Sequence, residues 1–131
     1  MSMHEVEILR AACCMASLDG TVSESEAVLL RRLADKVGVG EVSLNAMMAR
    51  AGRDPNFYRE QLRVLKTDAE QTMKVLMAVA AADGAITTEE RIILHHFAEK
   101  LGMDEERFQK SLGAWEQKLE QKKTNGGAKA E

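Results

Sequence analysis

The stretch DGTVSESE at Asp19–Glu26 returns 64 residues later as DGAITTEE at Asp83–Glu90. Each copy contains Asp-Gly, then a β-branched apolar residue, a hydroxyl residue and a final Glu. The surrounding sequence keeps the same offset, so that 7–39 aligns with 71–103. Self-similarity at one fixed offset indicates a duplicated structural unit. We therefore expect two copies of one helical unit, each built around an acidic corner.

The repeat also sets the expected domain limits. The chain has 131 residues, of which 45% are hydrophobic and 30% charged, as in a single globular domain. We expect that domain at 1–122, with repeats at about 7–51 and 71–115. Residues 123–131 lack apolar side chains that could join a core, so we expect a disordered tail there.

Local signals mark where helices begin. Ser or Thr followed three residues later by Glu can cap a helix reciprocally, and this pattern occurs at Ser2/Glu5, Ser23/Glu26, Thr67/Glu70 and Thr87/Glu90. Asp54-Pro55 indicates a further start, because proline suits the first helical position. Glycines that follow periodic segments indicate the ends, at Gly20, Gly38, Gly52, Gly84 and Gly102.

These signals, with the apolar periodicity, predict an all-α fold: a bundle of about seven helices made of two pseudo-symmetric halves. The predicted helices are 3–19, 24–37, 41–51, 55–65, 68–83, 88–101 and 104–121. The first helix of each repeat is apolar over much of its circumference and rich in alanine, so we expect those two helices at the centre.

Composition and motifs exclude several classes of function. The net charge of −3 comes without a basic stripe, so we expect no nucleic-acid partner. The longest apolar run, Val75–Ala82, is shorter than the roughly 20 residues of a spanning helix, so we expect no membrane insertion and a cytoplasmic location. We find no phosphate loop, nucleophile elbow or catalytic Cys-His pattern, and therefore expect no enzyme.

The acidic corners have two explanations. Glu26 and Glu90 occupy capping positions expected even in a protein that binds nothing. Asp19 and Asp83 each follow an apolar helix, where a carboxylate faces the negative end of the helix dipole at a cost of about 0.3–1 kcal/mol. Either each Asp accepts hydrogen bonds from amides of its turn and the following helix, or Asp and Glu together hold a hard cation.

An alanine-rich helix running into Asp-Gly-x-Val/Ile-Ser/Thr-x-x-Glu, twice, resembles the TerB-like family over about 7–112. That family includes tellurite-resistance proteins and the N-terminal region of a membrane co-chaperone. The resemblance implies a pseudo-symmetric helical bundle without catalytic activity, which acts in stress-response complexes and binds divalent metal. The metal positions it implies are Asp19, Glu26, Asp83 and Glu90. Ser17-Leu18 departs from the alanines that precede Asp83.

Any cation site at these corners differs from an EF-hand. Asp and Glu are seven positions apart in each corner, whereas the EF-hand loop separates them by eleven and carries further oxygen ligands between them. With so few carboxylates we expect a dissociation constant of about 10⁻⁴ M or weaker. Ca²⁺ or Mg²⁺ is the candidate ion, and no other cofactor is indicated.

We therefore expect a non-catalytic module of a stress or tellurite-response system, which acts through protein contacts and weak cation binding. The alternative is a co-chaperone-like adaptor whose acidic corners are only helix caps. In that alternative, the apolar stripe of Phe108, Leu112 and Trp115 contacts a partner instead of packing only in the bundle. The protein partner is not identified by the sequence, and a homodimer is left open.

Two residue pairs suggest metal or thiol chemistry but have simpler explanations. Cys13 and Cys14 are neighbours on a predicted helix, where their side chains point about 100° apart. We expect them to pack in the core as free thiols. His95 and His96 are also adjacent, without the i, i+4 spacing of a helical zinc site, and we expect them to face solvent.

Overall fold

The computed structural model describes the backbone of residues 3–18, 22–64 and 68–130, and most side chains between residues 5 and 122. Seven α-helices and no strand occur in these ranges, which confirms the all-α prediction. The helices are α1 (Met3–Ala16), α2 (Glu24–Val37), α3 (Glu41–Arg53), α4 (Pro55–Val64), α5 (Ala69–Ala81), α6 (Thr88–Lys100) and α7 (Glu105–Ala130).

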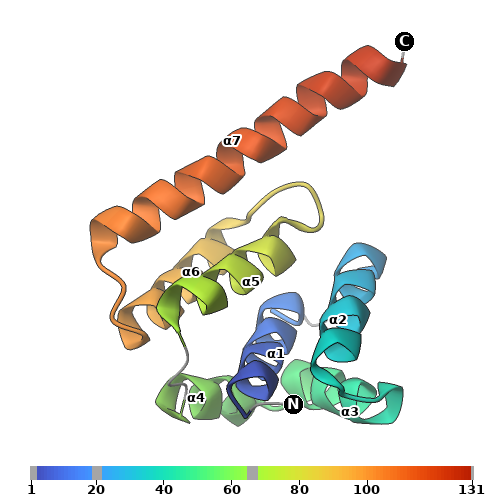
Figure 1. Cartoon of the computed structure of the whole chain (residues 1–131), viewed down its shortest axis with the longest axis vertical. Helices are drawn as coiled ribbons and strands as arrows, with labels where there is room; N and C mark the ends of the chain where they lie inside the picture. The colour runs from blue at the N-terminus through green and yellow to red at the C-terminus, as the bar shows by residue number, and fades with distance from the viewer. Residues whose placement is uncertain (1–2, 19–21, 65–67, 131) are drawn as a thin grey trace.

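Helices α1 and α5 are the central pair, as their apolar sequences predict. Helix α1 contacts α2, α3, α4 and α5, whereas α5 contacts α1, α2, α6 and α7. Within each repeat the three helices also contact one another, α1–α2–α3 in the first and α5–α6–α7 in the second. Helix α4 connects the two groups, and α7 lies across the side of α5 and α6 away from α1 (Figure 1).

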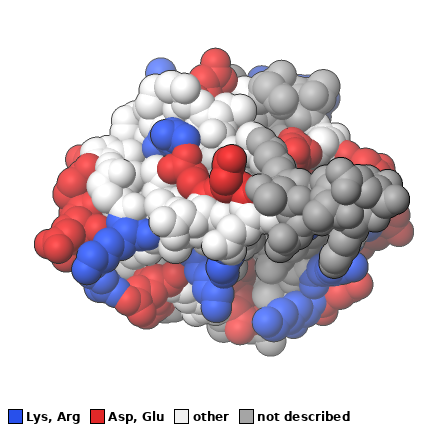
Figure 2. Space-filling view, turned by 90° about the horizontal axis from the view of Figure 1, so that it is seen from above, with Lys and Arg blue, Asp and Glu red and all other residues white. Residues whose placement is uncertain are grey.

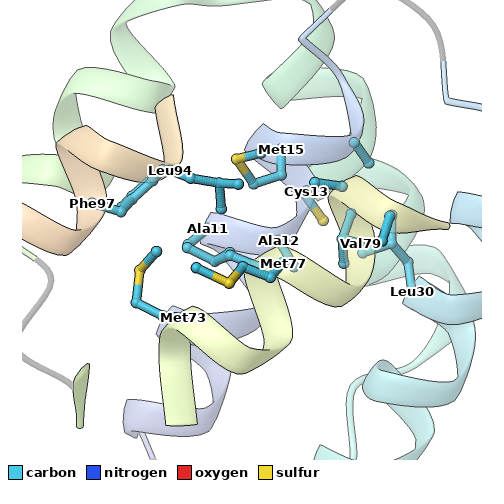
Figure 3. Packing of buried hydrophobic residues seen from close by; sticks show 14 of the residues in the cluster. Ala11, Ala12, Cys13, Met15, Leu30, Met73, Met77, Val79, Leu94 and Phe97 are labelled. Atoms are coloured by element: carbon cyan, nitrogen blue, oxygen red, sulfur yellow. The ribbon is translucent and has the colours of Figure 1, made fainter. Parts of the chain in front are cut away.

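Small and flexible side chains make the contact between the central helices. Ala11 and Ala12 of α1 are fully buried, and Met73 and Met77 of α5 are each about 1% exposed. Figure 3 shows Ala11 and Ala12 beside Met77, with Cys13 of α1 in the same packed layer. Short side chains allow the two backbones to approach, and methionine fills the remaining irregular space.

The residues at the predicted helix starts show which caps form. Ser23 and Thr87 cap α2 and α6 through complete capping boxes, as predicted. At the start of α5 the N-cap is Asp68, which accepts the Gln71 amide at 2.8 Å. Ser2 and Thr67 lie outside the described residues. Asp and Thr are both good N-caps, so two adjacent candidates leave the sequence ambiguous by one residue.

The ends of α2 and α6 have the same geometry at matching positions of the repeat. Gly38 and Gly102 adopt left-handed backbone conformations, with φ of 81° and 78°. The residue after each glycine donates its amide to the carbonyl five residues earlier, at 2.8 Å in the first copy and 2.9 Å in the second. These are the hydrogen bonds of a Schellman cap. Helices α2 and α6 therefore end in the same type of cap.

Helices α1 and α5 end earlier than predicted, at Ala16 and Ala81, whereas α3 and α7 end later. Gly52 does not end α3, which continues to Arg53 and stops at Asp54, directly before Pro55. The residue before proline is disfavoured in helical conformation, which supplies the stop. Helix α7 continues beyond 121 to Ala130, and Gly113 lies inside it. The side chains of 123–130 are not described, and the order of that tail stays a prediction.

The same Gly→Ala substitution should have opposite effects at different positions. Gly38→Ala and Gly102→Ala should each destabilise the protein by about 1 kcal/mol, because an L-residue is strained at positive φ. Gly113→Ala in α7 should stabilise it by about 0.5–1 kcal/mol. A new Cβ meets no atom within 4 Å at any of these positions. The change in the free energy of unfolding therefore reports the backbone conformation and not a steric clash. Urea unfolding monitored by circular dichroism tests both signs, and equal signs would contradict this account.

Candidate functional site

The two acidic corners meet in space. The hydroxyl of Ser23, in the first corner, donates a hydrogen bond to Oδ1 of Asp83, in the second, with an O–O distance of 2.6 Å. The C-terminal end of α5 and the start of α2 lie on the same side of the molecule (Figure 1). The sequence left open whether the corners are adjacent, and the structure shows that they are.

This contact offsets the unfavourable position of Asp83 in a way that the sequence reasoning did not foresee. The expectation was either a hydrogen bond within its own turn and the following helix or a bound cation. Instead, Asp83 receives a hydroxyl hydrogen from the other repeat. Hydrogen bonds to an ionised acceptor are stronger than those between neutral groups. Asp83 therefore has a structural role, as a link between the two copies.

Glu26 and Glu90 are buried members of the capping boxes. They are only 4% and 8% exposed, respectively. Oε1 of Glu26 accepts the Ser23 amide at 2.9 Å, and Oε1 of Glu90 accepts the Thr87 amide at 2.7 Å. The hydroxyls of Ser23 and Thr87 accept the Glu26 and Glu90 amides, both at 3.2 Å. Each glutamate thus satisfies a helix N-terminus while its carboxylate stays close to the corner.

The two corners share one cavity of about 510 Å³, open to solvent. Four carboxylates from α2, the second corner and α6 line the cavity: Glu26, Asp83, Glu89 and Glu90. The described lining residues include no Lys or Arg. Apolar residues at the end of α1, including Met15 and Leu18, complete the wall. On the face shown in Figure 2, Lys and Arg lie among Asp and Glu.

The electrostatic environment acts most clearly on Glu26. Burial raises the pKa of its carboxyl above the ordinary value of 4.5, and the hydrogen bonds with Ser23 lower it. The negative charges of Asp83 and Glu90 raise the pKa further. In the described part of the chain, no Lys or Arg pairs with Glu26 or Asp83. The charges of Glu26 and Asp83 are therefore not neutralised by a described Lys or Arg side chain.

The predicted metal positions are only partly described. Glu26, Asp83 and Glu90 lie around the shared cavity, whereas Asp19 lies outside the described residues. Among the side chains that the structure places, no group of three or more His, Cys, Asp or Glu is arranged to hold a metal ion. The metal role of Asp19, Glu26, Asp83 and Glu90 stays a prediction.

Cys13 and Cys14 are free, buried thiols, which confirms their predicted packing role. Burial raises the pKa of each from 9.0 to about 12, and the neighbouring Cys13 adds to the shift at Cys14. Because the thiolate is the reactive form, neither cysteine is suited to soft-metal or oxyanion chemistry in the folded protein.

His95 contacts two carboxylates, one on α6 and one on α7, an arrangement that the sequence did not predict. Its ring lies edge-on to Phe108, with centroids 5.2 Å apart, instead of facing only solvent. Nε2 lies 2.6 Å from Glu105 of α7, and Nδ1 lies 2.8 Å from Glu99 of α6. The hydrogen bond to Glu105 and the charges of both glutamates raise the pKa of His95. His95 thus holds α6 against α7. The sequence feature that could have indicated this role is Glu99, which lies four residues after His95 on the same helix.

No family model, curated protein or solved structure matches this chain. In the described part of the chain, no helix has both the length and the apolar character required to cross a bilayer.

Replacing Glu26 should reveal the cost of its charge. Gln keeps the Oε1 acceptor of the capping box, so Glu26→Gln should raise the melting temperature at about pH 7, where the wild-type carboxylate is ionised. A raised folded-state pKa means that wild-type stability is lost as pH rises through it. The gain should therefore shrink as pH falls through this raised pKa and disappear below 4.5, the ordinary glutamate pKa.

Glu106→Gln is a matched control, because Glu106 is an exposed first-turn residue of α7. It should change the melting temperature little at any pH. A Glu26→Gln variant that is less stable at neutral pH would show that the helix dipole and hydrogen bonds outweigh burial.

The cysteines should be protected by the fold. A thiol reagent such as dithionitrobenzoate should label neither residue in the folded chain at about pH 8, where ordinary thiols react readily. Both should react after denaturation, since both are free. Rapid labelling of the native protein would contradict the burial seen here.

Proposed function

We propose that this chain is a non-catalytic, TerB-like helical module of a stress or tellurite-response system. In this proposal it acts through protein contacts, and the cavity between its acidic corners binds a divalent cation weakly. The observation that carries the cation proposal is the Ser23–Asp83 hydrogen bond, which brings the corners together and leaves Glu26, Asp83 and Glu90 around one cavity.

The chemistry of the cavity favours a hard cation. Carboxylate oxygens are the ligands that Ca²⁺ and Mg²⁺ prefer, and four carboxylates line this cavity without a described Lys or Arg. Burial is the main cause of the raised pKa of Glu26, and a divalent ion would relieve the repulsion from Asp83 and Glu90 that adds to it. Weak affinity follows, because one oxygen each of Glu26 and Glu90 already accepts a backbone amide and water must complete the coordination.

A second candidate function has its own support. The capping boxes and the Ser23–Asp83 bond give structural roles to Glu26, Glu90 and Asp83 without any ion. In that case the corners are purely structural, and the module is a co-chaperone-like adaptor that depends on another surface. The two candidates differ in one measurable property, the response of the corner to divalent cations.

Calorimetric titration of the full chain with CaCl₂, and separately with MgCl₂, tests the cation proposal. We expect a dissociation constant of about 10⁻⁴ M or weaker in the wild type. Asp83→Asn should abolish the heat, because the amide retains an acceptor for Ser23 but removes the negative charge. Asp68→Asn is the matched control at the opposite end of α5, where Asn caps a helix as well as Asp does. It should bind as the wild type does.

A flat wild-type titration with both ions would reject cation binding and favour the adaptor. If Asp68→Asn and Asp83→Asn lose the same amount of heat, the heat comes from non-specific attraction of the cation to the negatively charged protein and not from binding at the acidic corners.

A further inference from the structure

A second cavity lies between α5 and α7 and has the opposite electrostatic character. Its volume is about 400 Å³, and it is open along one side. Its apolar floor is formed by Met73 and Met77 of α5, Met103 before α7, and Trp115 of α7. Met73 and Met77 are buried, whereas Met103 and Trp115 are partly exposed. We call this cavity the α5–α7 groove.

The charged residues of the α5–α7 groove are mostly basic. Four cations and one carboxylate line it: Lys74, Arg107, Lys110, Lys118 and Glu70. The whole chain, in contrast, has a net charge of −3. Arg107 pairs with Glu70, so the carboxylate is matched within the groove, and the three lysines remain in excess. Lys74, Lys110 and Lys118 are all exposed.

The spacing along α7 gives the groove the length of a short helix. Arg107, Ser111, Ala114 and Lys118 line it at intervals of three or four residues, with Lys110 beside Ser111, which places them on one face of α7. From 107 to 118 this face extends about 16 Å at 1.5 Å per residue. Small Ala114 and Ser111 lie between the basic residues, and Lys118 covers the Trp115 ring at 5.1 Å.

We propose that the α5–α7 groove binds an acidic amphipathic helix of a partner protein. The partner's apolar face would contact the methionines and Trp115, and its flanking carboxylates would meet the lysines. Helix-in-groove recognition uses such anchors at i, i+3 and i+4, and flexible methionines adapt to them. A flat anionic membrane fits less well, because the apolar residues form the floor of a concave site and the lysines its rim.

This inference rests on the protein-contact part of the proposed function and is independent of the cation. The acidic cavity lies at the C-terminal end of α5, whereas the groove is lined by Glu70, Met73, Lys74 and Met77 nearer the start of that helix. If the corner binds cations and the groove binds no peptide, the inference falls while the proposed function stands.

Trp115 is the single tryptophan of the chain and lies in the groove, so its fluorescence reports directly on binding. The probe is a synthetic helical peptide of about 16 residues, with Leu at i, i+3, i+4 and i+7, Glu on the flanks and no aromatic residue. A matched peptide carries Lys in place of every Glu. Anisotropy of fluorescein-labelled peptides provides a second readout that does not depend on Trp115.

We expect the acidic peptide to bind with a shift of Trp115 emission to shorter wavelength, and the basic peptide to bind at least about tenfold more weakly. Lys74→Glu with Lys110→Glu should weaken the acidic peptide about tenfold and strengthen the basic one. Arg32→Glu with Arg59→Glu is the matched control, since both arginines are exposed and neither lines the groove. It should leave both affinities within about twofold.

Three outcomes would overturn the inference. Equal binding of acidic and basic peptides would show that the groove has no charge preference, and unchanged binding in the Lys74/Lys110 variant would place the site elsewhere. Absence of peptide binding in both readouts would reject a helical partner of this chemistry, and co-sedimentation with phosphatidylglycerol vesicles in that case would assign the groove to a lipid surface. Tighter binding of the basic peptide to the Lys74→Glu/Lys110→Glu variant would also show that this variant is folded.

Discussion

The close packing of α1 against α5 is the constraint on which the rest of this structure depends. Ala11 and Ala12 allow the two helices to approach, and Met77 fills the space between them. Because this pairing brings the two helix–helix corners together, Ser23 of one repeat reaches Asp83 of the other. The remaining helices cover the central pair. A larger side chain at Ala11 or Ala12 would separate the helices, and overpacking of this kind commonly costs 1–3 kcal/mol.

Two cavities of opposite charge follow from this arrangement. The acidic cavity lies at the C-terminal end of α5, and the basic α5–α7 groove lies nearer its start. A net charge of −3 conceals both of them. The acidic cavity is also tied to stability, because Glu26 and Glu90 cap helices with the carboxylates that would contact an ion. The groove lysines, in contrast, are exposed and take part in none of the ion pairs of the described residues.

A helix end could be predicted from the sequence where only one nearby residue was suited to cap or stop the helix. The boxes of Ser23 and Thr87 formed as expected, because a capping box depends only on residues three apart. The start of α5 was misplaced by one residue, since Thr67 and Asp68 are comparable caps. Gly52 does not end α3, because a glycine inside a helix costs only about 1 kcal/mol. The stronger stop came from Asp54 before Pro55.

The amino-acid sequence by itself determined the all-α class, most helix boundaries, the central position of α1 and α5 and the burial of Cys13, because propensity, capping and periodicity act over a few residues. Only the tertiary structure decided that the corners meet, that His95 joins Glu105 and that the lysines of two helices border one groove. Ser23 and Asp83 are 60 residues apart in the chain. Their contact depends on the crossing of two helices, which is a property of packing and leaves no local pattern in the sequence.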